Sequence, residues 1–237
     1  MMKIVTLTVG QMGTNCYLVY DEDTSRCIII DPGEDADFIT TTILENKLSP
    51  QAILLTHGHY DHCLAVLDLK LNFDLPIYLH EKDLFLYKNA QKSAHFWFPV
   101  SPVKGRSPAS GGERGLNLQL PPIDHFLADQ EIISFGQSFL QVIHTPGHTP
   151  GSVCFISPVK GRNGTAERDL NLSLFTGDTL FADGVGRTDL SYSSSEDLQK
   201  SLQILHELPD ATLIYPGHGE TIVPLSSYTR IDSFSLS

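Results

Sequence analysis

A seven-residue segment constrains this 237-residue chain more than any other feature. Residues 56–62 read THGHYDH, with three histidines and an aspartate, and follow an apolar, strand-like run at 52–55. Imidazole nitrogens and carboxylate oxygens are ligands for zinc and its first-row neighbours. The alternative, a polar loop of solvated histidines, gives no reason for this spacing. The segment therefore predicts half of a metal site that residues elsewhere in the chain complete.

Three later segments have the format expected of the completing ligands. Each has an apolar strand, then a turn that contains glycine, then a histidine or an aspartate. They are TPGH, which ends at His148, FTGD, which ends at Asp178, and YPGH, which ends at His218. Taken singly these are ordinary turn sequences, but their shared format and order indicate one common site.

These motifs together resemble the metallo-β-lactamase superfamily, and within it the metallohydrolases of the glyoxalase II (hydroxyacylglutathione hydrolase) type. The resemblance extends from the opening strands to about residue 223, and GRTDL at 186–190 is similar to the short bacterial form. It implies one metal bound by His57, His59 and His148, a second bound by Asp61, His62 and His218, and a bridge between them at Asp178. It also implies two divalent ions, with zinc as the expected metal and iron or manganese as alternatives.

The pattern of expected elements agrees with this resemblance. Strands are expected near 3–9, 15–20, 26–31, 52–55, 76–79, 131–133, 138–144, 152–156, 172–176 and 212–215, and helices near 35–47, 62–71, 81–88 and 195–206. Two halves of strands with flanking helices predict an α/β fold, a four-layer αββα sandwich with the metals at one edge. At this length, we expect a single domain over residues 1–237.

The ligand set predicts hydrolysis by a dimetal-bound hydroxide. Two dications lower the pKa of a shared water towards roughly 7, and one of them polarises the carbonyl of the substrate. Asp61 is expected both to bind metal and to orient the hydroxide. Aspartate rather than cysteine at position 178 resembles the thioester, phosphodiester and lactone hydrolases of the superfamily. A thioester suits such a site, because a thiolate with a pKa of roughly 8.5 leaves with little help from an acid.

The substrate and two other functions stay open at this stage. Resemblance implies a small thioester derived from glutathione, although only 19 residues follow His218, where long-form glyoxalase II carries a helical glutathione-binding domain. Arg187 is a candidate for contacting a substrate carboxylate, or for fixing its loop by pairing with an aspartate. One alternative function is a persulfide dioxygenase of the same fold with a single iron. Another is a non-catalytic, metal-stabilised scaffold that binds a partner.

Composition excludes several classes of partner. A net charge of -12 argues against nucleic acid, whose phosphates require clustered basic residues. No apolar run approaches the roughly 18 residues of a membrane span, and the N-terminus reads as a strand rather than a signal peptide. The four cysteines form no C-x-x-C pair. We therefore expect a cytoplasmic protein with reduced thiols, and nothing in the sequence sets its oligomeric state.

A duplicated insert stands apart from these motifs. Residues 101–120 and 157–174 share SPVKGR, followed by ER-x-LNL-x-L after a spacer of different length. The two copies hold 6 of the 16 basic residues, which suggests a pair of substrate-contacting lips. The alternative, which we favour, is a mobile coding repeat that entered surface loops, where added length costs little entropy. The second copy predicts an extended hairpin loop between its flanking strands.

Overall fold

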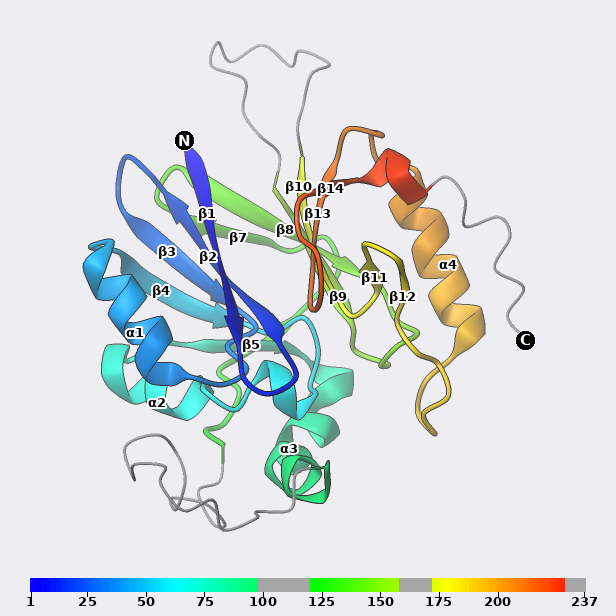
Figure 1. Cartoon of the computed structure of the whole chain (residues 1–237), viewed down its shortest axis with the longest axis horizontal. Helices are drawn as coiled ribbons and strands as arrows, with labels where there is room; N and C mark the ends of the chain where they lie inside the picture. The colour runs from blue at the N-terminus through cyan, green and yellow to red at the C-terminus, as the bar shows by residue number, and fades with distance from the viewer. Residues whose placement is uncertain (98–119, 158–171, 229–237) are drawn as a thin grey trace.

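Two six-stranded sheets lie face to face at the centre of the molecule, with helices on both outer sides (Figure 1). The computed structural model describes residues 1–97, 120–157 and 172–228. The first sheet consists, in spatial order, of β1 (Met2–Val9), β2 (Thr14–Asp21), β3 (Arg26–Ile30), β4 (Ser49–Leu54), β5 (Ile77–His80) and β6 (His125–Leu127). The second consists of β14 (Val223–Pro224), β13 (Leu213–Pro216), β10 (Ser173–Gly177), β9 (Val153–Ser157), β8 (Ser138–His144) and β7 (Ile132–Phe135). A small hairpin pairs β11 (Leu180–Phe181) with β12 (Gly184–Val185).

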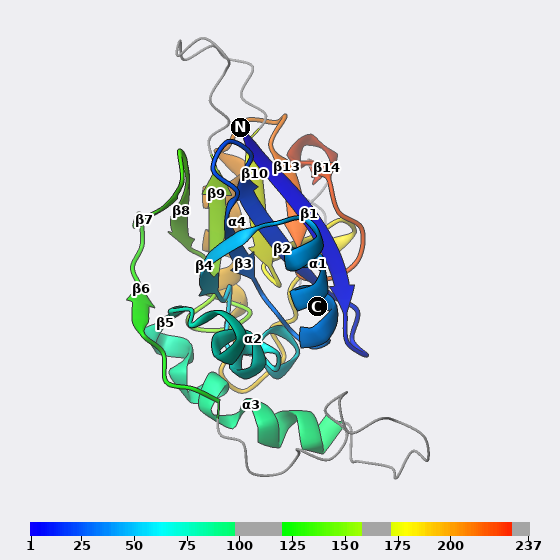
Figure 2. The ribbon, with the colours of Figure 1, turned by 90° about the vertical axis from the view of Figure 1, so that its left-hand side faces the viewer.

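The helices cover the outer faces of these sheets. They are α1 (Ala36–Glu45), α2 (Val66–Phe73), α3 (Leu84–Trp97) and α4 (Ser195–His206), with the short 3₁₀ turns η1 (Tyr60–His62), η2 (Glu81–Asp83) and η4 (Leu225–Tyr228). Seen from the side of α1, the helices α1 and α2 lie over the first sheet, while α4 lies behind the strands (Figure 2). None of the helices within the described residues is long and apolar enough to cross a membrane.

Alternating side chains along the central strands build three cores. In β3, Ile28 and Ile30 pack between the two sheets, whereas Ile29 packs with Ile39 and Ile43 of α1. In β9 the same alternation directs every second residue towards the core beneath α4. Successive strand side chains point to opposite faces, so a strand buried on both faces reads as a continuous apolar run. The three cores separate four layers, and the predicted αββα sandwich is confirmed.

Most predicted elements are present, with shifted boundaries at two helices. The helix expected over 62–71 begins only at Val66, and the η1 turn precedes it. The helix expected over 81–88 is the η2 turn followed by α3, which extends to Trp97. The sequence interpretation missed β6, β11, β12 and β14. The predicted start of α4 is confirmed, because Ser194 caps it by accepting a hydrogen bond from the backbone N–H of Asp197.

The strands that flank the second insert pair as predicted. β9 and β10 are antiparallel neighbours, with Ser157 opposite Ser173. Most of both inserts lies outside the described residues, so the extended hairpin loop, the favoured origin as a mobile repeat in surface loops and the alternative of substrate-contacting lips all stay predictions.

Candidate metal centre

The predicted ligands come together at one end of the sandwich. Residues 56–62 follow β4 of the first sheet, His148 lies between β8 and β9, and Asp178 and His218 follow the parallel strands β10 and β13. Backbone hydrogen bonds join the two sheets here. The N–H of Val153 donates to the carbonyl of Thr56 at 2.8 Å, and the loop after β13 is bonded to the start of β2 at 2.7 Å. Both sheets therefore contribute to a single site.

The seven side chains form two groups that share an aspartate. The first cluster consists of His57, His59, His148 and Asp178, and the second consists of Asp61, His62 and His218. Within each cluster the ligand atoms lie within 4.8 Å of one another. The shared aspartate is Asp178, which also lies close to His62 of the second cluster. In the first cluster, Nδ1 of His59 lies 3.0 Å from Nε2 of His57 and 3.1 Å from Nε2 of His148.

The second cluster is equally close. Nε2 of His62 lies 3.2 Å from Nε2 of His218, which is 3.3 Å from Oδ2 of Asp61. Asp178 lies between the clusters, with Oδ1 at 3.4 Å from Nε2 of His62 and Oδ2 at 3.6 Å from Nε2 of His148. These are the two groups, and the shared aspartate, that the resemblance implied.

Hydrogen bonds on the outer side of the rings direct nitrogen lone pairs inward. Nδ1 of His148 donates to the carbonyl of Arg187 at 3.0 Å, and Nδ1 of His218 donates to the carbonyl of Met12 at 3.2 Å. Carbonyl oxygens can only accept, so each of these Nδ1 atoms carries the proton. In a neutral imidazole the opposite nitrogen, Nε2, is then a free lone pair that faces the site.

Asp31 fixes the orientation of two further rings, that of His62 directly and that of His57 through Thr56. Its Oδ2 accepts from Nδ1 of His62 at 3.1 Å and from the hydroxyl of Thr56 at 2.6 Å. Because the Thr56 hydroxyl donates its hydrogen to Asp31, it can only accept from Nδ1 of His57, at 3.1 Å. In its neutral form, each of these two rings therefore also presents Nε2 as a lone pair to the site. Metal-binding histidines are typically oriented by such outer partners.

The site fits a divalent metal ion on three observations. Metal–nitrogen bonds of about 2.0–2.1 Å place two nitrogens of a tetrahedral site about 3.3 Å apart, close to the separations seen here. Oδ1 of Asp178 is buried and, within the described part of the chain, accepts no hydrogen bond. A Cβ added at Gly217 would lie 2.3 Å from that same oxygen, so the glycine leaves the space beside it open.

Electrostatics keep two imidazoles of the first cluster, those of His57 and His59, neutral. Burial lowers the pKa of His57 far below its usual value, and the imidazole of His62 adds to this effect. Burial, together with His148, lowers the pKa of His59 to about 3. Neutral imidazoles are the form that binds metal, so no proton has to be displaced from these rings at neutral pH.

The carboxylates in and around the second cluster instead favour a positive charge there. Burial lowers the pKa of His62, but the carboxylates of Asp178, Asp61 and Asp31 outweigh it and raise that pKa to about 10. Burial raises the pKa of Asp61, but His62 and His218 outweigh it and hold that pKa well below its usual range. Without a cation, a proton on His62 balances these carboxylates. A divalent ion can supply the same charge in its place.

Two residues with important contacts here escaped the sequence interpretation. Asp31 directly follows β3, is only 1% exposed and has a left-handed backbone (φ 49°). The only local feature of the sequence that marks it is the Pro-Gly turn that follows. The hydroxyl of Tyr192 lies 2.8 Å from Nε2 of His59, on the outer side of that ring. Tyr192 also contacts Phe85, with ring centroids 5.6 Å apart. Nothing in the neighbouring sequence marks Tyr192 as part of the site.

Arg187 pairs with an aspartate, the contact that the second of its two predicted roles requires. Its guanidinium pairs with both carboxylate oxygens of Asp189, at 2.6 and 2.7 Å, on the surface. Its backbone carbonyl accepts the hydrogen bond from His148 described above. A role of the Arg187 side chain in fixing the loop, and its contact with substrate, both stay predictions.

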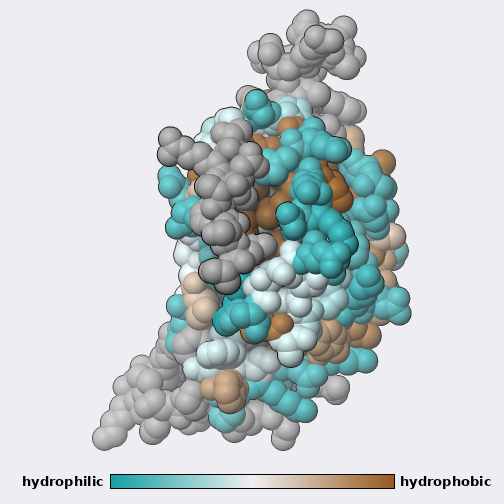
Figure 3. Space-filling view, turned by 90° about the vertical axis from the view of Figure 1, so that its right-hand side faces the viewer, coloured by the Kyte–Doolittle hydropathy of each residue, from teal (hydrophilic) through white to brown (hydrophobic). Residues whose placement is uncertain are grey.

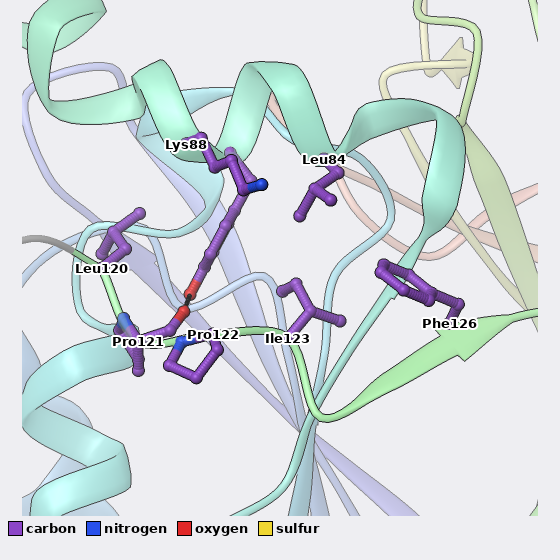
Figure 4. A pocket seen from close by; sticks show the side chains of 8 residues that line it. Leu84, Lys88, Leu120, Pro121, Pro122, Ile123 and Phe126 are labelled. Atoms are coloured by element: carbon purple, nitrogen blue, oxygen red, sulfur yellow. Dashed lines mark hydrogen bonds between the residues drawn. The ribbon is translucent and has the colours of Figure 1, made fainter.

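A separate pocket of about 380 Å³ lies between α3 and the chain leading to β6 (Figure 4). Its walls are mostly apolar, and they include Leu84, Ile123 and Phe126, with the amine of Lys88 on one side. None of the seven clustered residues lines it. On the side of the molecule where α4 lies, hydrophilic residues surround smaller apolar patches (Figure 3). The residues that line the pocket include no histidine or carboxylate, unlike the two clusters.

Comparisons with known proteins agree with this site. Residues 9–162 match the family model of the metallo-beta-lactamase superfamily. The chain is 35% identical over 219 residues to the probable metallo-hydrolase YqgX of Bacillus subtilis, covering 92% of this chain and 90% of that protein. It is 34% identical over 238 residues to the hydroxyacylglutathione hydrolase GloC of Haemophilus influenzae, covering 97% of this chain and 93% of that protein.

A solved structure extends the likeness to three dimensions. The crystal structure of TTHA1623 in a di-iron-bound form has a TM-score of 0.73 and 34% identity to this chain, covering 95% of this chain and 97% of that one. The relatives are matched over almost their whole length, and the predicted fold, the paired clusters and the family model point the same way. The chain therefore belongs to the metallo-β-lactamase superfamily.

Proposed function

We propose that this protein is a metal-dependent hydrolase of the glyoxalase II type, which cleaves S-acylglutathione-like thioesters. The observation that carries the proposal is the pair of clusters joined by Asp178, with the lone pairs of four imidazoles directed inward. The similarity to GloC, described as a hydroxyacylglutathione hydrolase, supports the substrate class. We propose zinc as the metal, and the di-iron form of TTHA1623 makes iron the alternative to test.

In this proposal His57, His59 and His148 would hold one ion and Asp61, His62 and His218 the other, with Asp178 available to both. Such ions, when bound, lower the pKa of a coordinated water and polarise the substrate carbonyl. The chain itself supplies the orientation of the reacting groups. Asp61 is ionised at neutral pH, so its carboxylate can accept a hydrogen bond from the attacking water and aim it at the carbonyl.

Aromatic side chains flank both clusters. Tyr192 lies beside His59, with Phe85 against it, and the ring of Phe181 lies 6.3 Å from that of His218. We propose that these rings bound the space for the acyl and thiol parts of the substrate. The departing thiolate, with a pKa of roughly 8.5, requires no protein acid.

The test is hydrolysis of S-lactoylglutathione by protein of known metal content, before and after chelation. Two metals per chain and thioester cleavage that stops on chelation and returns on adding zinc support the proposal. One iron per chain, no hydrolysis, and oxygen uptake with glutathione persulfide would instead identify the dioxygenase. Two bound metals without thioester cleavage would contradict the substrate class while leaving the metal centre in place.

A further inference from the structure

A buried carboxylate outside the two clusters connects their loops. Asp83 ends the η2 turn, is fully buried, and lies outside both clusters. Its Oδ2 accepts hydrogen bonds from the backbone N–H of Gly58 at 2.9 Å and from the hydroxyl of Thr149 at 2.6 Å. Its Oδ1 accepts from the backbone N–H of Gly151 at 2.6 Å. One side chain thus satisfies donors from two separate loops.

These donors are the immediate neighbours of metal-ligand candidates. Gly58 lies between His57 and His59, and Thr149 directly follows His148. All three donors of Asp83 therefore lie in the two segments that supply the imidazoles of the first cluster. The segments come from different sheets, and the spacing of their imidazole nitrogens depends on how these segments sit against each other.

Close packing at the two glycines supports the same conclusion independently. A Cβ added at Gly151 would lie 2.6 Å from Oδ1 and 2.8 Å from the backbone nitrogen of Asp83. A Cβ added at Gly58 would lie 2.7 Å from the backbone carbonyl oxygen of Asp83. Both loops approach Asp83 so closely that only glycine fits at these two positions.

We propose that Asp83 is a positioning residue that holds the His57–His59 loop against the His148 loop, so that their three imidazoles bind one metal ion. The proposal rests on the metal centre under Proposed function but not on which bond the enzyme cleaves. Asp83 touches neither ion nor substrate, and it acts through the geometry of the first cluster. Outer partners of this kind typically change metal affinity by about 10- to 100-fold.

The test variant is Asp83→Asn, which keeps the shape of the side chain. If its amide NH₂ takes the place of Oδ1, it faces the N–H of Gly151, and if it takes the place of Oδ2, it faces the N–H of Gly58. Either orientation leaves a backbone donor opposed by another donor. The matched control is Asp21→Asn, another buried carboxylate, which bonds to Thr24, Gln137 and Ser138 at the other end of β2.

The measurement is titration of the metal-free proteins with Zn²⁺ and with Co²⁺ against a chromophoric chelator, alongside their melting temperatures. Asp83→Asn is expected to weaken one of the two binding constants by about 10- to 100-fold and to leave the other within about 3-fold of wild type. Asp21→Asn is expected to lower the melting temperature with both constants unchanged. Cobalt spectra should show altered coordination only in Asp83→Asn.

Two outcomes would overturn the proposal. Wild-type affinity at both sites in Asp83→Asn would show that the loops keep their places without the carboxylate, and equal weakening of both sites would show a general effect on the fold. Should Asp83→Asn fail to fold, Thr149→Val removes a single donor. Thr149→Val is then expected to weaken metal binding at one of the two sites, by a smaller factor than expected for Asp83→Asn. Wild-type affinity at both sites in Thr149→Val would contradict the role of Asp83. If Asp83→Asn alters metal binding as expected but the wild-type protein shows no thioesterase activity, only the proposed function is contradicted.

Discussion

At the scale of single residues, the site depends on which atom of each side chain faces inward. Four of the five clustered imidazoles donate their outer N–H to a partner that can only accept, which leaves the inner nitrogen free for a metal. Asp61 differs from these imidazoles, because the residue is only 8% exposed, yet its low pKa keeps the carboxylate ionised. It is therefore the group best suited to orient an attacking water.

The first prediction concerns Asp61→Asn. The amide keeps an oxygen that can bind metal but loses the negative charge that orients the water, so turnover should fall about 100-fold or more while KM changes little. Steady-state kinetics with S-lactoylglutathione, on protein whose metal content matches wild type, check this. Unchanged turnover would rule out the orienting role.

The residues recovered from the sequence and the residues missed differ in a physical way. The seven clustered residues sit in short motifs whose ligand type and turn are local, so the sequence and its family resemblance found them. Asp31 and Asp83 act on positions 25 residues or more away, and Tyr192 reaches His59 across 133 residues. Tertiary packing brings such partners together, and no local spacing in the sequence indicates them.

At the scale of elements, the loops that carry the ligands are fixed by close contacts with neighbouring elements. Gly147, one residue before His148, has a φ of 146°, and a Cβ there would lie 2.4 Å from the backbone of Leu198 in α4. Its carbonyl accepts a hydrogen bond from the N–H of Ser194 at 2.8 Å. The start of α4 thus packs directly on the His148 loop.

The second prediction follows from this contact. Gly147→Ala should lower the free energy of unfolding by about 1–3 kcal/mol, because the methyl group must displace helix backbone. Gly184→Ala is the matched control, since a Cβ there meets no atom within 4 Å. Urea denaturation of both variants checks the difference. Equal stability of the two variants would show that α4 can move away from the loop without cost.

The third prediction concerns Asp21, which ties the end of β2 to the β7–β8 hairpin. Burial raises the pKa of Asp21, but hydrogen bonds from Thr24, Ser138 and Gln137 outweigh it and hold the pKa below its usual value. The unfolded chain therefore binds the proton more readily. The stabilisation is present above about pH 4 and is lost as the pH falls through the lower pKa of the folded state.

Asp21→Asn should therefore lower the free energy of unfolding by about 1–3 kcal/mol at pH 7 and make stability fall less steeply below about pH 4. Urea unfolding between pH 3 and about pH 7 measures both effects. Asp23→Asn is the control, because that carboxylate is 62% exposed. A loss of stability at pH 7 no larger than that of the control would contradict the role given to Asp21.

Element boundaries were harder to predict than the elements themselves. The alternating and continuous apolar runs located ten strands, since burial on one or both faces leaves a direct pattern. The helix expected from residue 62 fails because the ligand loop first makes the η1 turn, and Cys63 then leaves helical geometry (φ -139°). β6 was missed because it is three residues long and mostly exposed, with no apolar pattern of its own.

At the scale of the whole molecule, the metal centre lies where the two sheets meet, so bound ions link both halves of the sandwich. A ligand that binds only the folded state stabilises it, by about 2.7 kcal/mol at 100 times its Kd. For a chain of this size each kcal/mol shifts the melting temperature by about 2–4 °C. The arrangement of the ligands thus couples metal content to global stability.

The fourth prediction is that chelation lowers the melting temperature by about 5–10 °C and that added zinc restores it. Differential scanning calorimetry, with metal content measured in parallel, provides the check. An unchanged melting temperature in protein shown to be free of metal would mean that the sheets hold the site without help from the ions.

The most direct test of the metal centre is a crystal structure of protein purified without added metal, with anomalous diffraction collected across the zinc and iron absorption edges. We predict two anomalous peaks per chain, one among His57, His59, His148 and Asp178, and the other among Asp61, His62, His218 and Asp178. A single peak confined to the first cluster would contradict the two-metal site and favour mononuclear iron chemistry. Peaks away from both clusters would contradict the assignment of these seven residues as ligands.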